Sequence, residues 1–228
     1  MKQLALGVRL RAGAVYASFA PGPNAEIVTA LRAPGIAPMW LWGGAGSGKT
    51  HLLQAACSEA GAAAAYFPLH RTAKLPPDAL SGFERNRLLC IDDVDQIAGD
   101  AAWERALFGL FNEAAELHTR LIFAAAVAPR RPSWVLGDWR SRAAACIVYQ
   151  LRELDDDGRI EALRLRAAQR GLQLPRETAE YLLKRMPRDL PSLFDILDAL
   201  DEASLVEQRR LTVPFIRDEL EKHAGTKS

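Results

Sequence analysis

Short apolar runs alternate with amphipathic stretches through the first two thirds of the chain. Between the third and fourth runs, large apolar side chains recur at helical spacing from Ala101 to Leu117. Strands that alternate with helices usually pair in parallel, with helices on both faces of the sheet. The pattern therefore predicts an α/β domain with a parallel five-stranded sheet. Its strands are the runs Met39 to Trp42, Ala62 to Leu69, Leu88 to Ile91, Leu121 to Val127 and Cys146 to Tyr149.

After the acidic stretch Leu154 to Gly158 the pattern changes, because only helical periodicity remains. Gly171, Pro187 and Pro214 lie between these helical segments or open them. The pattern predicts a small all-helical lid after the α/β domain. Its helices are expected over Arg159 to Arg170, Arg176 to Arg185, Leu190 to Gln208 and Val213 to His223.

The first residues have a mixed character and end at Phe19 to Pro23, where two prolines oppose a helix. Asn24 is a candidate N-cap for a short helix through Ala33, which Pro34-Gly35 would stop. We therefore expect three segments. They are an extended leader over 1–23, the α/β domain over 24–154 and the helical lid over 155–228.

Composition indicates an ordinary globular protein, since 49% of the 228 residues are apolar and 25% are charged. The formal net charge of +1 argues against a protein that binds DNA without a partner. Cys57, Cys90 and Cys146 form no metal-binding or redox pair in the sequence and are predicted to be buried thiols. With no signal-peptide core and no apolar run of about eighteen residues, a cytoplasmic protein without a membrane contact is expected.

The segment from Gly43 to Thr50 matches G-x-x-x-x-G-K-[ST] completely and lies between a predicted strand and a predicted helix. Its backbone N–H groups and the helix N-terminus would surround the β-phosphate, and Lys49 would neutralise the β- and γ-phosphates. The motif predicts binding of ATP or ADP with Mg²⁺, to which Thr50 would give its hydroxyl. A glycine-rich turn without a ligand is the alternative. The predicted nucleotide-binding residues are Gly43, Gly44, Ala45, Gly46, Ser47, Gly48, Lys49, Thr50 and His51.

The apolar strand from Leu88 ends in two acids, Asp92 and Asp93. P-loop proteins keep the second part of their metal site at this place. Asp92 would hold Mg²⁺ through water, and Asp93 would polarise the attacking water as a general base. A solvated acidic turn is the alternative, but the preceding P-loop favours the metal site.

These residues resemble the DnaA-related AAA+ ATPases, and within them the branch of Hda, the regulatory inactivators of DnaA. The resemblance covers nearly the whole chain and implies a P-loop AAA+ domain, a helical lid and a homo-oligomer. Beyond the P-loop it rests on LCIDDVDQIAGD at Leu89 to Asp100, Trp103-Glu104, Leu110 to Glu113 and Leu121 to Phe123.

The N-terminal segment Gln3-Leu4-Ala5-Leu6-Gly7-Val8 resembles the Q-L-x-L-P-Φ peptide by which such proteins bind the DNA polymerase III sliding clamp, the β subunit. The resemblance implies that Gln3, Leu4 and Leu6 contact the clamp, and that DNA is reached only through it. Gly7 replaces the usual proline, which reduces preorganisation of the peptide. An ordinary first β-strand is the alternative.

Two arginines match functional positions of the family. Arg142 falls at the arginine finger, which reaches a nucleotide on the neighbouring subunit, and Arg188 falls at sensor 2, which approaches the bound nucleotide from the lid. A solvated surface arginine and a helix-end arginine paired with an acid are the respective alternatives. The stretch Ala124 to Ala126 stands where related ATPases carry a polar sensor 1 residue, so intrinsic ATP hydrolysis is expected to be weak.

The resemblance favours a regulatory subunit that stimulates hydrolysis of DnaA-bound ATP and so inhibits replication initiation, with ADP as its own nucleotide. An initiator is a second hypothesis, although a helix-turn-helix domain of about a hundred residues would be expected after the lid. A helicase loader or a divergent AAA+ adaptor of the same clade is a third, although a loader carries a separate helicase-binding region before its AAA+ core.

Overall fold

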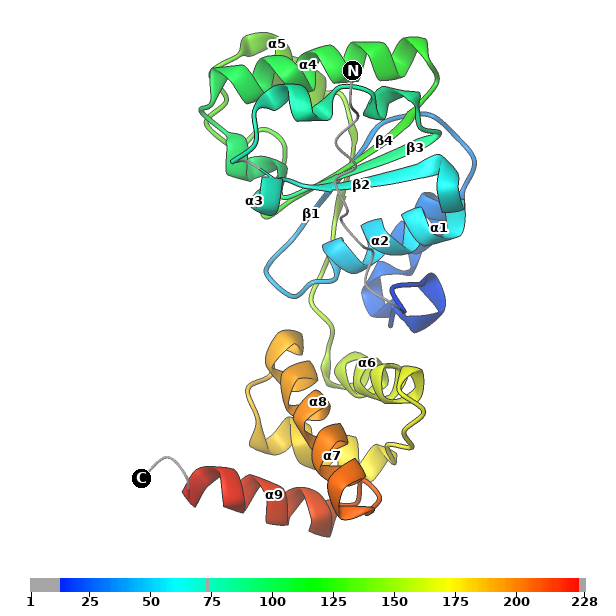
Figure 1. Cartoon of the computed structure of the whole chain (residues 1–228), viewed down its shortest axis with the longest axis vertical. Helices are drawn as coiled ribbons and strands as arrows, with labels where there is room; N and C mark the ends of the chain where they lie inside the picture. Colours follow the sequence, from blue (N-terminus) through cyan, green and yellow to red (C-terminus); the bar gives the residue numbers. More distant parts are fainter. Residues whose placement is uncertain (1–12, 73, 226–228) are drawn as a thin grey trace. The chain divides into compact units, whose positions relative to one another are not determined.

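The computed structural model describes residues 13–72 and 74–225 (Figure 1). These residues form two compact units. The first unit contains residues 13–17 and 24–153, and the second contains residues 18–23 and 154–225. Among the described helices, none is long and apolar enough to cross a membrane.

A parallel β-sheet forms the centre of the first unit. The described residues give it five strands in the order β2-β3-β4-β1-β5. The strand β1 lies between β4 and β5 and pairs with both, so that Trp40 lies opposite both Phe123 and Val148. The predicted fold class is confirmed. The strands are β1 (Met39–Trp42), β2 (Ala64–Pro68), β3 (Leu88–Asp92), β4 (Arg120–Ala125) and β5 (Ile147–Gln150).

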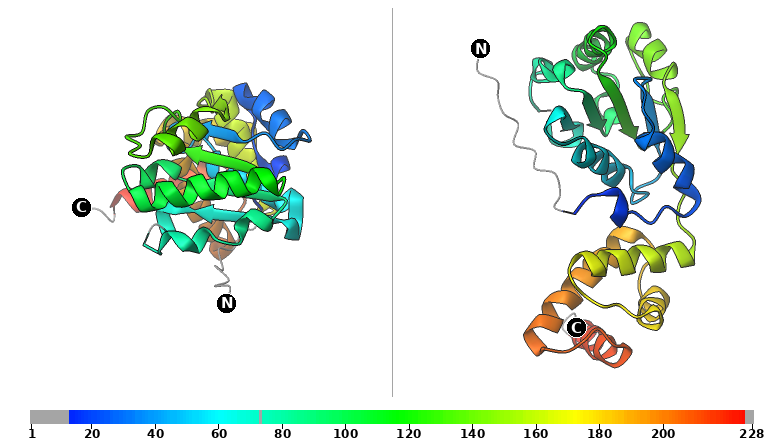
Figure 2. Two further views of the ribbon diagram at one scale, coloured as in Figure 1. Left: turned by 90° about the horizontal axis from the view of Figure 1, so that it is seen from above. Right: turned by 90° about the vertical axis from the view of Figure 1, so that its right-hand side faces the viewer.

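Helices cover both faces of this sheet, as parallel pairing requires. The helix α2, with α1 beside it, lies on one face, and α4 and α5 lie on the other (Figures 1 and 2). The α-helices are α1 (Ala25–Arg32), α2 (Lys49–Ala60), α3 (Leu69–Thr72), α4 (Ala101–Glu116) and α5 (Gly137–Ala144). Short 3-10 turns occur at Tyr16–Ser18, Gly22–Asn24, Gly61–Ala63, Pro77–Leu80, Phe83–Arg85 and Val94–Ile97.

The two faces of β3 have different roles. Leu89 and Ile91 belong to the apolar core beneath α4 and α5, whereas Cys90 and Asp92 alternate onto the side of α2. Aromatic rings fill the core: Trp139 packs edge-on against Phe123, with 5.6 Å between ring centroids. Burial of such rings fixes α4 and α5 on the sheet. The three cysteines are buried free thiols, as predicted.

Residues 13–23 differ from the expected extended arm. They contain the turn Tyr16–Ser18 and lead into the turn Gly22–Asn24. The side chains of Ala14 and Ala20 are buried. Proline fixes φ at a value that turns also accept, so Pro23 is compatible with the turn Gly22–Asn24.

Asn24 precedes α1 as predicted, but its side chain does not cap that helix. Its amide Nδ2 donates to the carbonyl of Arg152 at 2.9 Å, and the N–H of Arg152 donates to its Oδ1 at 2.8 Å. The side chain is buried, so a partner 128 residues away replaces the local cap. Asparagine is a preferred N-cap residue, so the sequence indicated a cap; it gave no sign of the contact with Arg152.

The helix α5 was not predicted, because its apolar pattern is weak. Only Trp139 and Ala143 of its eight residues are buried. The strands β2 and β4 are shorter than expected. The residues before β2 form the 3-10 turn Gly61–Ala63, and β4 ends at Ala125.

The second unit is helical, with an apolar core that includes Leu163, Leu182 and Phe215. Asp155 caps the first helix by accepting from the N–H of Gly158, which explains why this helix begins before Arg159. The predicted helices are confirmed, with small shifts of their ends. They are α6 (Asp156–Gln169), α7 (Arg176–Arg185), α8 (Leu190–Glu207) and α9 (Val213–Gly225).

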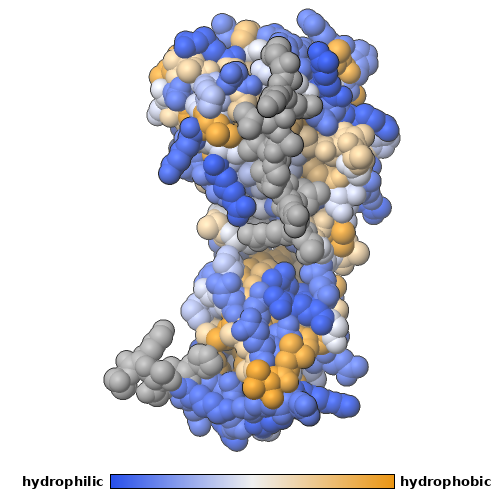
Figure 3. All heavy atoms as spheres, viewed as in Figure 1, coloured by the Kyte–Doolittle hydropathy of each residue, from blue (hydrophilic) through white to orange (hydrophobic). Residues whose placement is uncertain are grey.

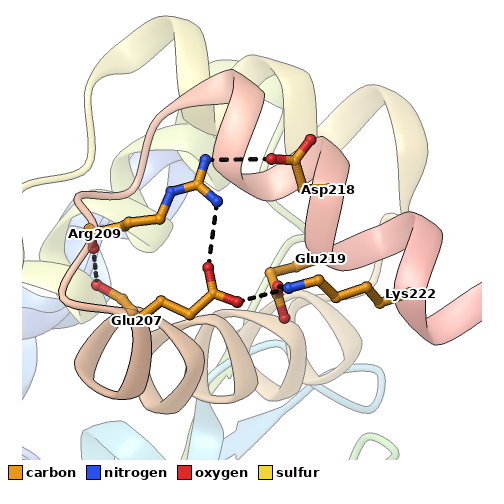
Figure 4. A network of polar contacts seen from close by, with 6 residues as sticks. Glu207, Arg209, Asp218, Glu219 and Lys222 are labelled. Carbon is orange, nitrogen blue, oxygen red and sulfur yellow. Dashed lines mark hydrogen bonds and ion pairs between the residues drawn. The ribbon is translucent and has the colours of Figure 1, made fainter.

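Ion pairs that are exposed except at the buried Glu219 join the end of α8 to α9 (Figure 4). Arg209 bonds to Glu207 and Asp218, and Lys222 bonds to Glu207 and Glu219. Such exposed pairs contribute little stability individually. The visible faces of both units are mainly hydrophilic, with apolar atoms in small separate groups (Figure 3).

Candidate nucleotide-binding site

The loop between β1 and α2 has the backbone of a phosphate-binding turn. Gly46 and Gly48 have φ values of 74° and 95°, in the left-handed region that favours glycine. Gly48 directly precedes the first residue of α2, Lys49. The loop therefore directs its backbone into the first turn of the helix, as the sequence motif predicts.

Gly43 lies in close contact with Leu151, the residue that follows β5. A Cβ atom at Gly43 would lie 2.7 Å from the carbonyl oxygen of Leu151, whereas one at Gly44 would have its nearest neighbour, the Glu153 Oε1 atom, at 3.9 Å. Contacts under 3.0 Å with backbone force a displacement. The first glycine of the motif is thus required by packing in this chain.

We expect Gly43→Ala to lower the free energy of unfolding by about 1–3 kcal/mol, the usual cost of overpacking. Gly44→Ala is the matched control and should cost less than about half of that, because its Cβ has room. Denaturant unfolding of both variants measures the difference. Equal stability of the two proteins would contradict the steric argument.

The first turn of α2 has no side-chain cap. By contrast, Asp100, Asp155 and Asp189 cap α4, α6 and α8. The Oγ atom of Ser47 is buried and has no hydrogen-bond partner within the described part of the chain. Uncapped N–H groups beside an unpaired hydroxyl fit an anion such as a phosphate.

The ammonium of Lys49 lies over the loop. Its Nζ atom donates to the carbonyl oxygens of Gly43 and Gly44, at 2.7 and 2.8 Å. Burial lowers the pKa of Lys49, while the nearby carboxylates, chiefly that of Asp92, oppose this shift. A phosphate oxygen offers a charged acceptor in place of these carbonyls, so the arrangement suits phosphate binding.

The carboxylate of Asp92 is buried at the end of β3. It accepts hydrogen bonds from the Thr50 hydroxyl at 2.6 Å and from the Tyr66 hydroxyl at 2.8 Å. Burial and Asp92 both raise the pKa of Tyr66, which keeps the phenol as a donor. The carboxylate and hydroxyl are the hard oxygen ligands that Mg²⁺ prefers. Thr50 and Asp92 therefore fit the predicted metal site.

Asp93 adopts the left-handed conformation, with φ of 58°. Its Oδ2 atom lies 2.6 Å from the Nδ1 atom of His70, on α3. Burial and the neighbouring Asp92 raise the pKa of Asp93, while His70 opposes the shift. A raised pKa makes the carboxylate a better proton acceptor, in line with the predicted general base.

Sequence reasoning missed Tyr66, His70 and Asp95 at this site. Tyr66 and His70 belong to β2 and the residues after it, which the parallel sheet places beside β3. The Oδ1 atom of Asp95 accepts from the N–H of Ala126, the residue that follows β4. Tyr66 and His70 reach β3 through strand pairing, for which the residue pattern gave no signal, whereas Asp95 is close to Asp93 in the sequence itself.

The predicted His51 contacts the residues that precede α1. Its Nε2 atom lies 3.1 Å from the carbonyl oxygen of Val15. Residues 13–15 therefore pass beside the start of α2. The predicted clamp residues Gln3, Leu4 and Leu6 lie outside the described residues.

Arg142 is exposed on α5, on the face of the sheet opposite α2. Its guanidinium lies over the rings of Phe108 and Phe111 on α4, at 5.8 and 5.7 Å from their centroids. Arg140 of the same helix is also exposed. Arg142 is thus an exposed cation that contacts two aromatic rings, on the opposite face of the sheet from the P-loop helix.

Arg188 belongs to the second unit, and its side chain is 63% exposed. It pairs with Asp156 at 3.3 Å. Asp189 instead caps α8 by accepting from the N–H of Ser192. Within this unit, Arg188 is thus paired with an acid, as the alternative to the sensor 2 role expected. The sensor 2 role remains a prediction.

Comparison with known proteins gives two kinds of match. The family model for the Hda lid domain matches residues 156–220. Domain III of the Thermotoga maritima replication initiation protein DnaA matches in structure with a TM-score of 0.77 and 21% identity, over 94% of this chain and 98% of that chain.

Two longer proteins share the fold. AMPPCP-bound DnaA from Aquifex aeolicus matches with a TM-score of 0.61 and 26% identity, over 77% of this chain and 60% of that chain. The Thermotoga maritima RuvB Holliday junction branch migration motor matches with a TM-score of 0.59 and 16% identity, over 81% of this chain and 61% of that chain. The chain thus spans less than two thirds of these proteins. Together with the P-loop and the parallel sheet, these findings show that the chain has the AAA+ fold found in DnaA and that residues 156–220 are similar to the Hda lid domain.

Proposed function

We propose that this chain binds an adenine nucleotide with Mg²⁺ and stimulates the hydrolysis of ATP bound to DnaA, thereby inhibiting replication initiation. The observation that carries the proposal is the match of residues 156–220 to the Hda lid domain. DnaA of Aquifex aeolicus, which has the same fold, binds the adenine nucleotide analogue AMPPCP. The chain would act in the cytoplasm, as a homo-oligomer tethered to DNA through the sliding clamp.

The resident nucleotide is proposed to be ADP, with ATP as the alternative. Lys49 and the uncapped start of α2 would hold its phosphates, and Thr50 and Asp92 would hold Mg²⁺, which neutralises phosphate charge. Arg188 would approach the nucleotide as sensor 2. Hydrolysis by this chain itself is proposed to be weak, because the end of β4 and the residue after it carry only methyl side chains, at Ala124 to Ala126.

Arg142 would act as the arginine finger toward ATP on DnaA. Its exposure leaves the guanidinium available to another subunit. Its place on the face of the sheet opposite α2 favours action on a neighbour over action on its own nucleotide. A cation delivered by a second subunit stabilises charge on the transferring phosphoryl group.

A single-turnover assay tests the proposal. DnaA is loaded with radiolabelled ATP, and hydrolysis is followed with this chain, with clamp loaded on DNA, with both, or with neither. We expect acceleration only when the chain and the loaded clamp are both present. No acceleration in the complete mixture would contradict the proposal, and co-purification with the replicative helicase would favour the loader hypothesis.

The clamp contact can be measured separately. We expect the double change Gln3→Ala with Leu6→Ala to weaken binding to purified clamp at least about tenfold, since it removes the amide and one apolar anchor of the peptide. Lys2→Ala is the matched control, because it alters the same segment outside the motif. Surface plasmon resonance compares the proteins. Unchanged affinity of the double variant would exclude this segment as the clamp peptide.

A further inference from the structure

Glu104 of α4 is a buried acid with no role in the proposed nucleotide site. It is 0% exposed, and among the described residues no cationic side chain pairs with it. Its Oε1 atom accepts from the N–H groups of Gly99 and Val135, at 2.9 and 3.2 Å. Its Oε2 atom accepts from the N–H of Leu136, at 2.6 Å. Three backbone donors thus compensate the burial of one carboxyl group.

These bonds fix the point at which α5 begins. Leu136 directly precedes α5, and no side chain of the helix's own segment caps its first turn. The carboxylate of Glu104 holds the N–H of this residue and that of Val135 before it. A negative charge also stabilises the N-terminal end of a helix. Glu104 therefore connects α4 to the start of α5.

The same face of α4 supports Arg142. Glu104, Phe108 and Phe111 follow one another at spacings of four and three residues, which places them on one side of the helix. The rings of Phe108 and Phe111 lie under the Arg142 guanidinium. One face of α4 thus contacts α5 at two places, at Leu136 before its first residue and at Arg142 in its last turn.

We propose that the α4 face formed by Glu104, Phe108 and Phe111 positions Arg142 for its action on the nucleotide of the neighbouring subunit. The proposal rests on the finger role proposed above. A displacement of about 1 Å at a group that acts on a reacting phosphate costs roughly a hundredfold in rate. Glu104 and Phe108 are positioning residues, because they act through Arg142 and do not themselves touch the nucleotide.

The test uses Glu104→Gln in the full-length chain. Glutamine keeps the size of the side chain but replaces one acceptor oxygen with an amide donor, so it cannot accept all three backbone bonds. We expect the maximal rate of DnaA-bound ATP hydrolysis to fall between about tenfold and a hundredfold. The concentration of the chain that gives half-maximal stimulation and its own affinity for ADP should stay unchanged. Glu113→Gln is the matched control, because Glu113 is exposed on the same helix.

A double variant separates positioning from general stabilisation. If Glu104 acts through Arg142, then Glu104→Gln should cause no further loss in an Arg142→Ala background. Phe108→Leu provides a second variant that leaves the Glu104 bonds in place. It should also lower the maximal rate, and this effect should likewise vanish without Arg142. If Glu104→Gln does not fold, the Phe108→Leu variant tests the positioning proposal in its place.

The possible failures are distinct. Wild-type rates in folded Glu104→Gln and Phe108→Leu proteins would overturn the positioning proposal while the finger role stands. An equal loss with and without Arg142 would also overturn it, since the residues would then act by another route. Full stimulation by Arg142→Ala alone would instead overturn the finger role.

Discussion

An Arg142→Ala protein is expected to stimulate hydrolysis of DnaA-bound ATP about a thousandfold less than the unchanged chain, at the lower end of measured arginine-finger effects. The guanidinium would stabilise charge on the transferring phosphoryl group, and alanine has nothing to replace it. The side chain is exposed, and among the described residues it lies over the rings of Phe108 and Phe111. The fold should therefore survive the change. Single-turnover hydrolysis with clamp-loaded DNA measures the effect.

Two further variants make this result specific to the finger. Arg140→Ala removes an exposed arginine from the same helix and should leave most of the stimulation intact. Arg142→Lys keeps a charge but loses the planar guanidinium, so it should restore little activity. Affinity of each variant for ADP should match that of the unchanged chain. Stimulation by Arg142→Ala at the normal rate would exclude this residue as the finger.

Replacement of Lys49 by alanine is expected to weaken ADP binding by roughly thirtyfold to a few thousandfold. Loss of one partner from a buried charged contact costs about 2–5 kcal/mol, and each 1.4 kcal/mol is about tenfold in affinity. Lys49 is the cation that lies over the loop, held by the Gly43 and Gly44 carbonyls. Isothermal titration with ADP and Mg²⁺ measures the change.

The control for this prediction is Lys74→Ala, which removes an exposed lysine of the same unit outside the loop. It should bind ADP normally. The rise in melting temperature that ADP gives to the unchanged chain should disappear in Lys49→Ala, because ligand stabilisation follows affinity. If Lys49→Ala binds ADP as tightly as the unchanged chain, the loop is not the phosphate site.

Much of the fold could be predicted because its local signals agree. The apolar run Met39 to Trp42, the glycine loop and the helix from Lys49 each point to the same unit of strand, loop and helix. The lid helices were also predictable, since apolar positions recur at helical spacing between glycine and proline residues. Consistent local preferences of this kind determine element type and order.

The less regular parts could not be predicted, because their conformation depends on distant partners. The helix α5 buries only Trp139 and Ala143 and begins where Glu104 of another helix holds the backbone. Asn24 has the residue type of a cap, yet a buried bond to Arg152 determines its conformation. A periodicity argument uses only neighbours in sequence, so it contains no signal for such pairs.

The sequence by itself determined the phosphate-binding loop, the acids Asp92 and Asp93, and the succession of the strands and most of the helices along the chain, because each depends on residue types within a few positions of one another. The tertiary structure decided which of these residues meet. The strand order β2-β3-β4-β1-β5 places β3 beside β2. Asp92 therefore accepts a hydrogen bond from Tyr66, and Asp93 contacts His70. It likewise brings Thr50 to Asp92 across 42 residues. Such meetings follow from the packing of the whole sheet and its helices, which no local pattern specifies.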